Sequence, residues 1–382
     1  MNLAEEIEGY VSRNRDATLA LLKELAAIPA PTGQEGHRAA FCLDWLRRQG
    51  GTDAEIDASG NVVLPLGVRP DAPLAVYMAH MDTVFPDTGR ITVTEDADRL
   101  YAPGIGDDTA NLVNLLMAAA FFLRRPALCP RTGLLFVADT GEEGMGNLRG
   151  SRGIFQEYGD RISAFVSFDL YMNSVVNTAV GSQRYKITVR TKGGHSLTDF
   201  GSRSAVQVLA EIIGRLYAVS LPPEGRTTYN VGRIEGGTSV NTIAESAWML
   251  YEFRADRAEN LEYMESQLTR VLKKSQYPDA HMERKLLGVR PCRSGEDTEE
   301  LRRFAEDNRA VLARYSPCPV HFSAGSTDAN LPLSLGIPAV TFGTVLGGGA
   351  HTRAEWIVKD SLEAGQRAAI ADVACWFNIP GD

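Results

Sequence analysis

Acidic residues and one histidine stand where three apolar runs of this sequence end. His80 and Asp82 follow the run that begins at residue 74, Glu142 and Glu143 follow the run around residues 133–138, and Asp169 follows the run at residues 164–168. If the first run is a strand, His80 and Asp82 face the same side, because side chains two apart on a strand point the same way. A single histidine–aspartate pair would be weak evidence, but three runs with such endings predict one common site.

Two further segments supply matching residues. Asp107 lies in GIGDDT and His351 lies in a glycine-rich stretch, GGGAHT. Together the candidates are imidazoles and carboxylates without a cysteine, a set that suits Zn²⁺ first and also Co²⁺ or Mn²⁺. One carboxylate shared by two metal ions would hold them ~3.5 to 4 Å apart, as in two-metal hydrolases. A neighbouring carboxylate that binds no metal could serve as a general base.

The elements that must position these residues follow an alternating pattern. Helical spacing of apolar residues predicts helices over residues 3–28 and 35–48, and a buried helix over 110–123 with Thr109 as its N-cap. Apolar strands separate these helices, which is typical of an α/β fold with a mostly parallel twisted sheet flanked by helices. In such sheets the ligand site lies beyond the carboxyl ends of the strands, where the candidate residues stand.

The pattern changes near residue 183. From there to residue 291 the order of expected elements is β-α-β-β-α-β, and the first strand alternates polar and apolar residues. This order is that of a small ferredoxin-like α+β domain with an antiparallel sheet. We therefore expect a catalytic domain formed by residues 1–182 and 292–382, with residues 183–291 inserted as a lid or dimerisation domain.

Composition excludes several classes of partner. The 382 residues carry 39 Lys and Arg against 48 Asp and Glu, a net charge of -9, without a basic run, so neither nucleic acid nor an anionic membrane is expected as a partner. The acidic N-terminal stretch is unlike a secretory signal, and no apolar run is long enough to span a membrane. Five scattered cysteines without a C-x-x-C pair are typical of reduced thiols in a cytoplasmic protein.

Other catalytic motifs are missing from the sequence. The glycines of GIGDDT lack the third member of a dinucleotide fingerprint, and there is no phosphate-binding P-loop. A G-x-S-x-G nucleophile elbow is also absent, which argues against a serine hydrolase of that type.

Five ordered motifs carry a resemblance to a known family. HMDTVFP, GIGDDTANL, DTGEEGMGN, SFDL and GGAHTRAEW resemble the motif series of the dinuclear zinc exopeptidases related to peptidase T, carboxypeptidase G and aminoacylase. The resemblance implies two Zn²⁺ per chain and a cis peptide bond after Asp107, which would bridge both ions. The other implied metal ligands are His80 and Asp169 at the first ion and Glu143 and His351 at the second.

The remaining roles also come from the resemblance. Asp82 would orient His80, and Glu142 would be the general acid and base that assists attack of a zinc-bridging water. In the inserted domain, His195 and Asn241 would contact substrate, with the histidine supplied by the partner subunit in dimeric members. Arg254 stands where some carboxypeptidase-like relatives hold a substrate carboxylate. The simpler alternatives are a surface loop for His195 and a salt bridge to Glu252 for Arg254.

The resemblance favours a cytoplasmic peptidase that acts on short peptides. An aspartate at position 169 tends to accompany aminopeptidase or dipeptidase action in that family, so we expect an aminopeptidase, dipeptidase or tripeptidase-like exopeptidase. An N-acyl-amino-acid deacylase or a carboxypeptidase is the alternative within the family. A catalytically inactive peptide-binding relative is the alternative from another class. We also expect a homodimer through the inserted domain.

Overall fold

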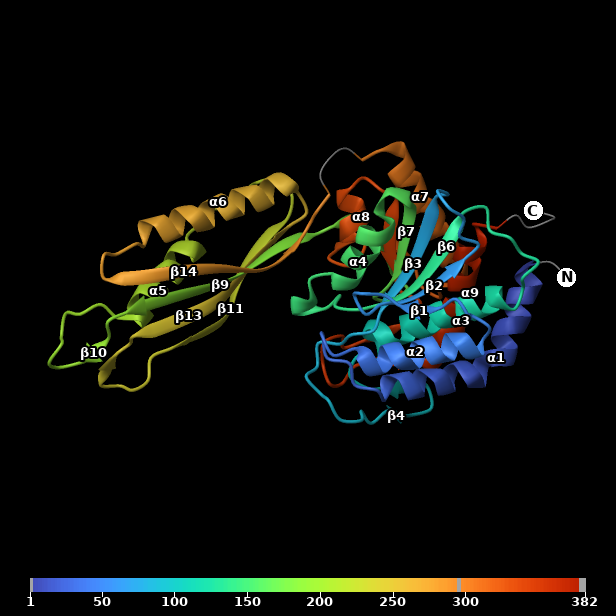
Figure 1. Ribbon diagram of the computed structural model, residues 1–382, viewed down its shortest axis with the longest axis horizontal. Coiled ribbons are helices and arrows are strands. Elements are labelled where there is room, and N and C mark those ends of the chain that lie inside the picture. Colours follow the sequence, from blue (N-terminus) through green and yellow to red (C-terminus); the bar gives the residue numbers. More distant parts are fainter. Residues whose placement is uncertain (1–2, 294–296, 378–382) are drawn as a thin grey trace. The chain divides into compact units, whose positions relative to one another are not determined.

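The chain forms two compact units. The computed structural model describes residues 3–293 and 297–377. One unit comprises residues 1–178 together with 295–382, and the other comprises residues 179–294 (Figure 1). The sequence analysis placed the inserted domain at residues 183–291, a few residues inside the second unit at either end.

An eight-stranded sheet is the centre of the first unit. Its strand order is β1-β2-β6-β3-β7-β16-β8-β15. The middle pairs β6–β3, β3–β7 and β7–β16 are parallel, whereas the pairs β1–β2, β2–β6 and β16–β8 are antiparallel. The strands are β1 (Glu55–Ile56), β2 (Val62–Leu66), β3 (Leu74–His80), β6 (Gly133–Asp139), β7 (Ile162–Phe168), β8 (Ser174–Ala179), β15 (His321–Gly325) and β16 (Ala339–Phe342). The predicted α/β class with a largely parallel sheet is confirmed.

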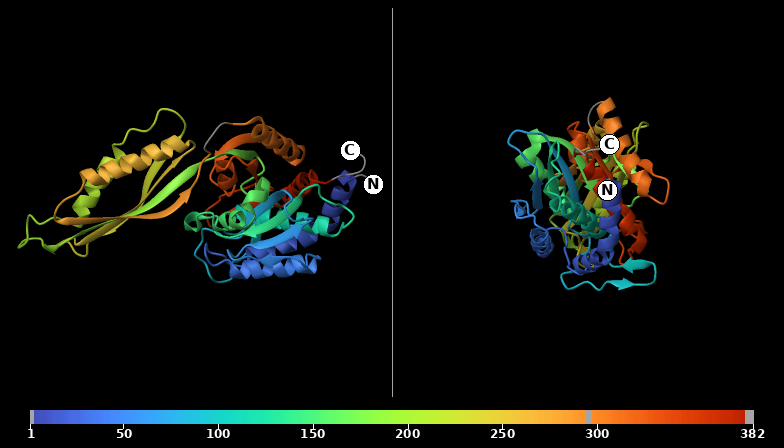
Figure 2. Two further views of the ribbon diagram at one scale, coloured as in Figure 1. Left: turned by 45° about the horizontal axis from the view of Figure 1, so that its top comes forward. Right: turned by 90° about the vertical axis from the view of Figure 1, so that its right-hand side faces the viewer.

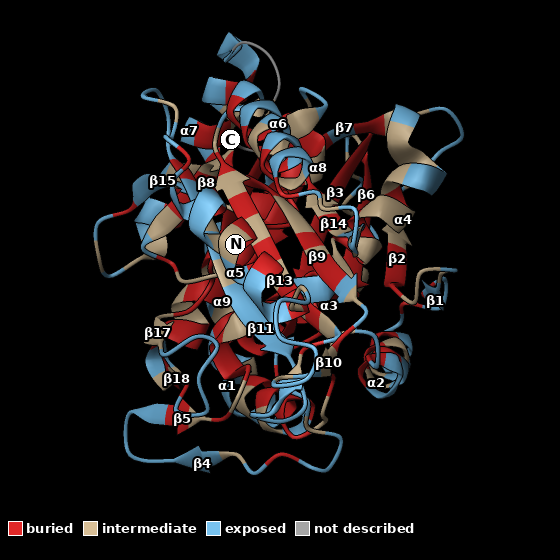
Figure 3. Cartoon of the chain, turned by 90° about the vertical axis from the view of Figure 1, so that its left-hand side faces the viewer, coloured by how far each residue is buried: buried red, intermediate tan, exposed pale blue. Residues whose placement is uncertain are grey.

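Helices flank this sheet (Figure 2). They are α1 (Leu3–Ala26), α2 (Gly36–Arg48), α3 (Asn111–Leu123), α4 (Arg149–Tyr158), α7 (Glu299–Tyr315), α8 (Asn330–Ser334) and α9 (Lys359–Ala374). Every residue of β3 and β6 is buried, as are nearly all of those in β7 and α3, which Figure 3 shows in red for the three strands. A strand covered on both faces cannot alternate polar and apolar residues, so these runs are continuously apolar.

The start of α3 differs from the prediction. Thr109 is not its N-cap but lies in the preceding turn, η1 (Ile105–Ala110), and its hydroxyl donates to the carbonyl of Gly104. A second small sheet lies beside this turn, in the order β17-β18-β5-β4, with β4 (Thr94–Glu95), β5 (Arg99–Tyr101), β17 (Gly347–Gly348) and β18 (Trp356–Val358). Two short 3₁₀ turns, η2 (Gly144–Gly146) and η3 (Gly159–Arg161), flank α4.

The second unit is an α+β sandwich of two layers. Its antiparallel sheet has the order β11-β13-β9-β14, formed by β9 (Gly181–Thr191), β11 (Thr227–Gly236), β13 (Ser246–Ala255) and β14 (Ala280–Arg290). Helices α5 (Ala205–Tyr217) and α6 (Ala258–Lys274) contact each other and both central strands, so they cover the same face. This is the ferredoxin-like order that the sequence predicts. A short pair, β10 (Gly194–His195) with β12 (Thr242–Ile243), extends from it.

The second unit has its own hydrophobic core, separate from the core of the first unit. Buried residues of β9, β13, α5 and α6 form one cluster, to which Phe253 and Met249 contribute fully buried side chains. Across the described parts of the chain, 3–293 and 297–377, the helices are all too short or too polar to cross a membrane.

Candidate metal centre

Three adjacent parallel strands deliver the predicted ligands to one edge of the sheet. β3 lies between β6 and β7, and its last residue, His80, is paired in register with Asp139 of β6. Glu142 and Glu143 follow β6, and Asp169 follows β7 directly. Since the carboxyl ends of parallel strands lie at the same edge, residues far apart in sequence come together there.

Asp107 lies between the two histidines. Its Oδ1 is 3.1 Å from Nε2 of His80, and its Oδ2 is 3.1 Å from Nε2 of His351. The same nitrogen of His351 is 2.8 Å from Oε1 of Glu143, and Nε2 of His80 is 4.0 Å from Oδ1 of Asp169. A carboxylate with one oxygen directed at each histidine has the arrangement of a ligand shared by two metal ions. The peptide bond between Asp107 and Asp108 is cis, as predicted.

Two groups of donor atoms could each hold a metal ion, and His80 belongs to both. One group of close donors consists of His80, Asp107 and Glu143, and a second consists of His80, Asp108 and Asp169, with the atoms of each group within 4.8 Å of one another. Nitrogen and oxygen donors of this kind suit Zn²⁺, Co²⁺ or Mn²⁺. The side chains of both groups are also shielded from solvent, so their charges need a partner such as a cation.

The many carboxylates of the site shift the pKa values of its residues. Burial alone would lower the pKa of His80, but nearby carboxylates, Asp108 first, outweigh it and raise the pKa well above its usual value. Burial also favours the neutral form of Asp107, yet its hydrogen bonds with His351 and His80 lower its pKa. For Asp169, burial and then the charge of Asp107 raise the pKa to about 7.

The exposed histidine of the site responds mainly to hydrogen bonds. Contacts with Asp107 and then Glu143 raise the pKa of His351 to about 10. These contacts favour the protonated forms of His80 and His351 beside the carboxylates. A metal ion must displace these protons, because only neutral imidazole binds metal.

Asp82 holds the loop that carries the glutamates. Nδ1 of His80 is 3.0 Å from the backbone carbonyl of Asp82 and 3.5 Å from its carboxylate. That carboxylate accepts the backbone N–H groups of Glu142 (3.1 Å) and Glu143 (3.0 Å) and the hydroxyl of Thr32 (2.8 Å). It is fully buried and lies on the Nδ1 side of His80, away from the nitrogen that faces Asp107. Its contacts thus position His80 and both glutamates.

The sequence analysis missed three buried residues around the site. Asp108 accepts the backbone N–H of His80 at 2.9 Å, and burial raises its pKa. Glu355 accepts three backbone N–H groups of the turn that carries Asp107. Arg38 donates to the backbone carbonyls of Ile28 and of Met81, the residue between His80 and Asp82. The Asp107–Asp108 doublet and the acid four residues after His351 were available as signals, whereas nothing in the sequence around Arg38 marks it.

Two predicted substrate-binding residues meet at one end of the second unit. His195 pairs with Thr242 across the β10–β12 ladder, and the carbonyl of Asn241 accepts the N–H of Ser196 at 3.0 Å. Both residues are exposed. The structure thus brings His195 and Asn241 into one loop cluster within that unit.

Arg254 lies elsewhere in the second unit. It is near the far end of β13, opposite Ser182, and the ladder places it on the order of 26 Å along the strand from Ser246. Its guanidinium contacts Glu252 through Nε (3.1 Å) and Nη2 (3.3 Å). This is the salt bridge that the sequence analysis weighed against a substrate contact. The length of β13 separates Arg254 from His195 and Asn241.

Comparisons with known proteins establish the family of the chain. The family model described as peptidase family M20/M25/M40 matches residues 76–371. The chain is 37% identical over 106 residues to the LysW-lysine hydrolase of Deinococcus radiodurans, which is 27% of either chain. It is 25% identical over 265 residues to a probable carboxypeptidase of Uncinocarpus reesii, which is 60% of this chain and 59% of that one. The chain thus covers less than two thirds of the length of these curated relatives.

A solved structure extends the comparison over nearly the whole fold. A tripeptidase from Staphylococcus aureus superposes with a TM-score of 0.75 at 23% identity, covering 95% of this chain and 99% of that chain. At this identity the likeness establishes the fold. With the family match over most of the sequence, the chain belongs to peptidase family M20/M25/M40, a family of hydrolases that act on peptide or amide bonds.

Proposed function

We propose that this protein is a two-zinc exopeptidase that cleaves short peptides from a free N-terminus. The observation that carries the proposal is the position of Asp107, whose two oxygens lie 3.1 Å from Nε2 of His80 and 3.1 Å from Nε2 of His351. The family's hydrolytic members and the named tripeptidase of the same fold support peptide hydrolysis. When bound, the two ions would polarise the scissile carbonyl and lower the pKa of a water molecule.

The residues of the chain would bind the metal ions, transfer the proton and contact the substrate. The five metal-binding side chains would be His80, Asp107, Glu143, Asp169 and His351. Glu142, buried and anchored through its backbone N–H to Asp82, would take a proton from the attacking water and return it to the leaving amine. Asp82 would keep His80 and the glutamate loop in place. In the second unit, His195 and Asn241 would contact substrate.

Three features bear on the type of substrate: the residue at position 169, the named relatives and the contacts of Arg254. Aspartate at position 169 and the named tripeptidase favour an aminopeptidase, dipeptidase or tripeptidase. The relative named as a probable carboxypeptidase favours the alternative of a carboxypeptidase or N-acyl-amino-acid deacylase. Arg254 would serve that alternative as a carboxylate anchor, but its bidentate contact with Glu252 occupies the guanidinium in the isolated chain. We therefore keep the peptidase as the main proposal.

Location and assembly complete the proposal. Five free cysteines suit a reducing cytoplasm. A homodimer through the second unit would use its edge strand β11, which is mostly exposed and presents Ile234 at 52% exposure. Exposed edge strands with apolar side chains are common sites of association.

Replacement of Glu142 tests the mechanism. Because a general acid–base group contributes ~10² to 10⁴-fold to a rate, Glu142→Gln is expected to lower kcat on di- and tripeptides by about that factor. The variant should retain the two metal ions of the wild type, since Glu142 is not a proposed ligand. Steady-state kinetics and elemental analysis of the same preparations measure both quantities.

The matched control is Glu300→Gln, the same change at an exposed position at the start of α7. It should leave kcat and metal content unchanged. Near-wild-type turnover of Glu142→Gln would contradict the mechanism. Absence of turnover by the zinc-loaded wild type on peptides and N-acyl amino acids alike would favour the inactive peptide-binding alternative.

A further inference from the structure

Glu355 accepts hydrogen bonds from the backbone of the turn that carries Asp107. It is fully buried, in the loop between β17 and β18, four residues after His351. Its Oε1 accepts the N–H groups of Gly106 (2.8 Å) and Asp107 (2.7 Å), and its Oε2 accepts the N–H of Gly104 (2.8 Å). A side chain at position 106 would place its Cβ 3.0 Å from Oε1, so glycine permits this close approach. Glu355 therefore joins the turn of Asp107 to the segment of His351.

Arg38 holds the other side of the same turn. It is fully buried on α2, and its Nη1 donates to the carbonyl of Met81 (2.8 Å) and to Oγ1 of Thr109 (3.1 Å). Its Nε donates to the carbonyl of Ile28 (2.8 Å). The Thr109 hydroxyl in turn donates to the carbonyl of Gly104. Arg38 thus links the residue between His80 and Asp82 to the end of the turn.

These bonds are made by protein atoms alone. The turn from Gly104 to Thr109 is joined to the His351 segment by Glu355 and to the His80 segment by Arg38, and these contacts direct Asp107 between the histidines. Burial raises the free-energy cost of breaking such charge-assisted bonds. A ligand that is already ordered loses less conformational freedom when it binds.

We propose that Glu355 and Arg38 are positioning residues that preset Asp107 for two metal ions before either ion binds. The inference rests on the metal site of the proposed function, although neither residue is a ligand in it. A purely structural role would lower the stability of the first unit without a particular effect on metal affinity. Metal affinity is therefore the quantity that separates the two roles.

Glu355→Gln is the first test. Glutamine has nearly the same size, but one of its terminal atoms is an NH₂ group, which cannot accept a backbone N–H. Loss of a group that orients a ligand typically lowers metal affinity or activity by ~10 to 100-fold. Co²⁺ titration of the metal-free full-length protein, followed by visible absorption and calorimetry without substrate, should show a loss of that size for at least one ion.

Asp372→Asn is the matched control. It makes the same acid-to-amide change at a buried carboxyl of the first unit. This carboxyl lies on α9 and accepts a hydrogen bond from Tyr77, not from the turn of Asp107. It should bind both ions with wild-type affinity. Arg38→Met, which removes the donors to Met81 and Thr109, should resemble Glu355→Gln. Should Glu355→Gln fail to fold, Glu355→Asp keeps the charge but shortens the reach and is expected to weaken Co²⁺ binding similarly.

The outcomes separate this inference from the proposed function. Wild-type Co²⁺ affinity at both sites in folded Glu355→Gln and Arg38→Met overturns the positioning role while leaving the proposed function intact. An equal loss of affinity in Asp372→Asn also overturns it, because the effect would then follow general destabilisation. A wild-type chain that binds no Co²⁺ contradicts the metal site itself, and the positioning role with it.

Discussion

At the scale of single residues, the hydrogen bonds of His195 define which of its nitrogens can act. Its Nδ1 accepts the backbone N–H groups of Leu197 (3.2 Å) and Thr198 (3.4 Å). A neutral imidazole that accepts at one nitrogen carries its proton on the other. Nε2 is then the nitrogen available as a donor, as the proposed contact with a substrate carbonyl oxygen would need.

His195→Ala is expected to lower kcat by ~10² to 10³-fold, the loss typical of removing one donor to a developing oxyanion. Metal content should not change, because the histidine is in the second unit. The control is His281→Ala, an exposed histidine on β14. Kinetics should be paired with the mass in solution by sedimentation. A monomer with full activity would contradict a contribution of His195 from a partner subunit.

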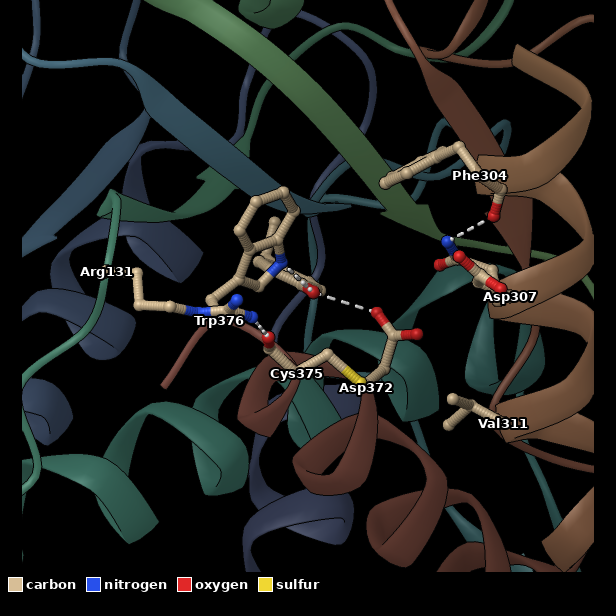
Figure 4. A pocket seen from close by; sticks show the side chains of 9 residues that line it. Arg131, Phe304, Asp307, Val311, Asp372, Cys375 and Trp376 are labelled. Carbon is tan, nitrogen blue, oxygen red and sulfur yellow. Dashed lines mark hydrogen bonds between the residues drawn. The ribbon is translucent and has the colours of Figure 1, made fainter. Parts of the chain in front are cut away.

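At the scale of elements, the packing of α9 against β3 contains a buried carboxyl. Asp372 accepts the hydroxyl of Tyr77 at 2.8 Å, and the indole of Trp376 donates to that hydroxyl oxygen at 2.8 Å. These residues border a pocket of about 190 Å³, with Phe304, Asp307 and Val311 of α7 on its opposite side (Figure 4). Burial raises the pKa of Asp372 to about 7, while its bond with Tyr77 has a smaller, opposite effect.

This shift predicts a pH dependence of stability. Between the unfolded pKa of about 3.9 and the folded value, the native state binds more protons than the unfolded state, so stability falls as pH rises. Between pH 5 and pH 8 the metal-free protein should lose about 2 to 3 kcal/mol of unfolding free energy from this group. Asp372→Asn should remove that part of the pH dependence. Urea unfolding of both proteins at the two pH values measures it.

The control for this experiment is Asp307→Asn, an exposed acid that borders the same pocket. It should retain the wild-type pH dependence. If Asp372→Asn and the wild type lose equal free energy between pH 5 and pH 8, then Asp372 is ionised in the folded protein throughout that range, contrary to the shift described above.

At the scale of the whole molecule, two separate cores hold the two units. The first is built around the parallel sheet and α3, and the second lies between α5, α6 and the antiparallel sheet. The proposed metal ligands belong to the first unit, whereas His195, Asn241 and Arg254 belong to the second. Damage to the second core should therefore affect substrate handling before it affects metal binding.

Phe253→Ala tests this separation. The side chain is fully buried in the second core, and deleting it should cost about 3 to 5 kcal/mol. We expect a lower unfolding temperature for the second unit and reduced turnover, with Co²⁺ affinity unchanged. Phe322→Ala, at a residue of β15 that is 38% exposed, is the control of the same chemical type. A parallel loss of Co²⁺ affinity in Phe253→Ala would show that the units fold as one.

The sequence by itself determined the fold class, and it singled out five proposed ligands whose side chains lie close together: His80, Asp107, Glu143, Asp169 and His351. Continuous apolar strands require burial on both faces, and polar residues at their ends then fall at one edge of a parallel sheet; this places His80, Glu143 and Asp169 together. Their proposed roles came from the resemblance of motifs. Periodicity alone put Thr109 at a helix start, because it does not register the extra turn before α3.

Tertiary structure decided what lies around that site. Arg38, Asp108 and Glu355 act through backbone groups distant in sequence, and local sequence pattern carries no information about such partners. The same holds for Arg254, which lies 13 residues after Asn241 in the sequence but is separated from the His195 end of the unit by the length of β13. Strand endings are a local property, whereas the bonds that aim Asp107 between two histidines exist only once α2, the η1 turn and the His351 segment have packed together.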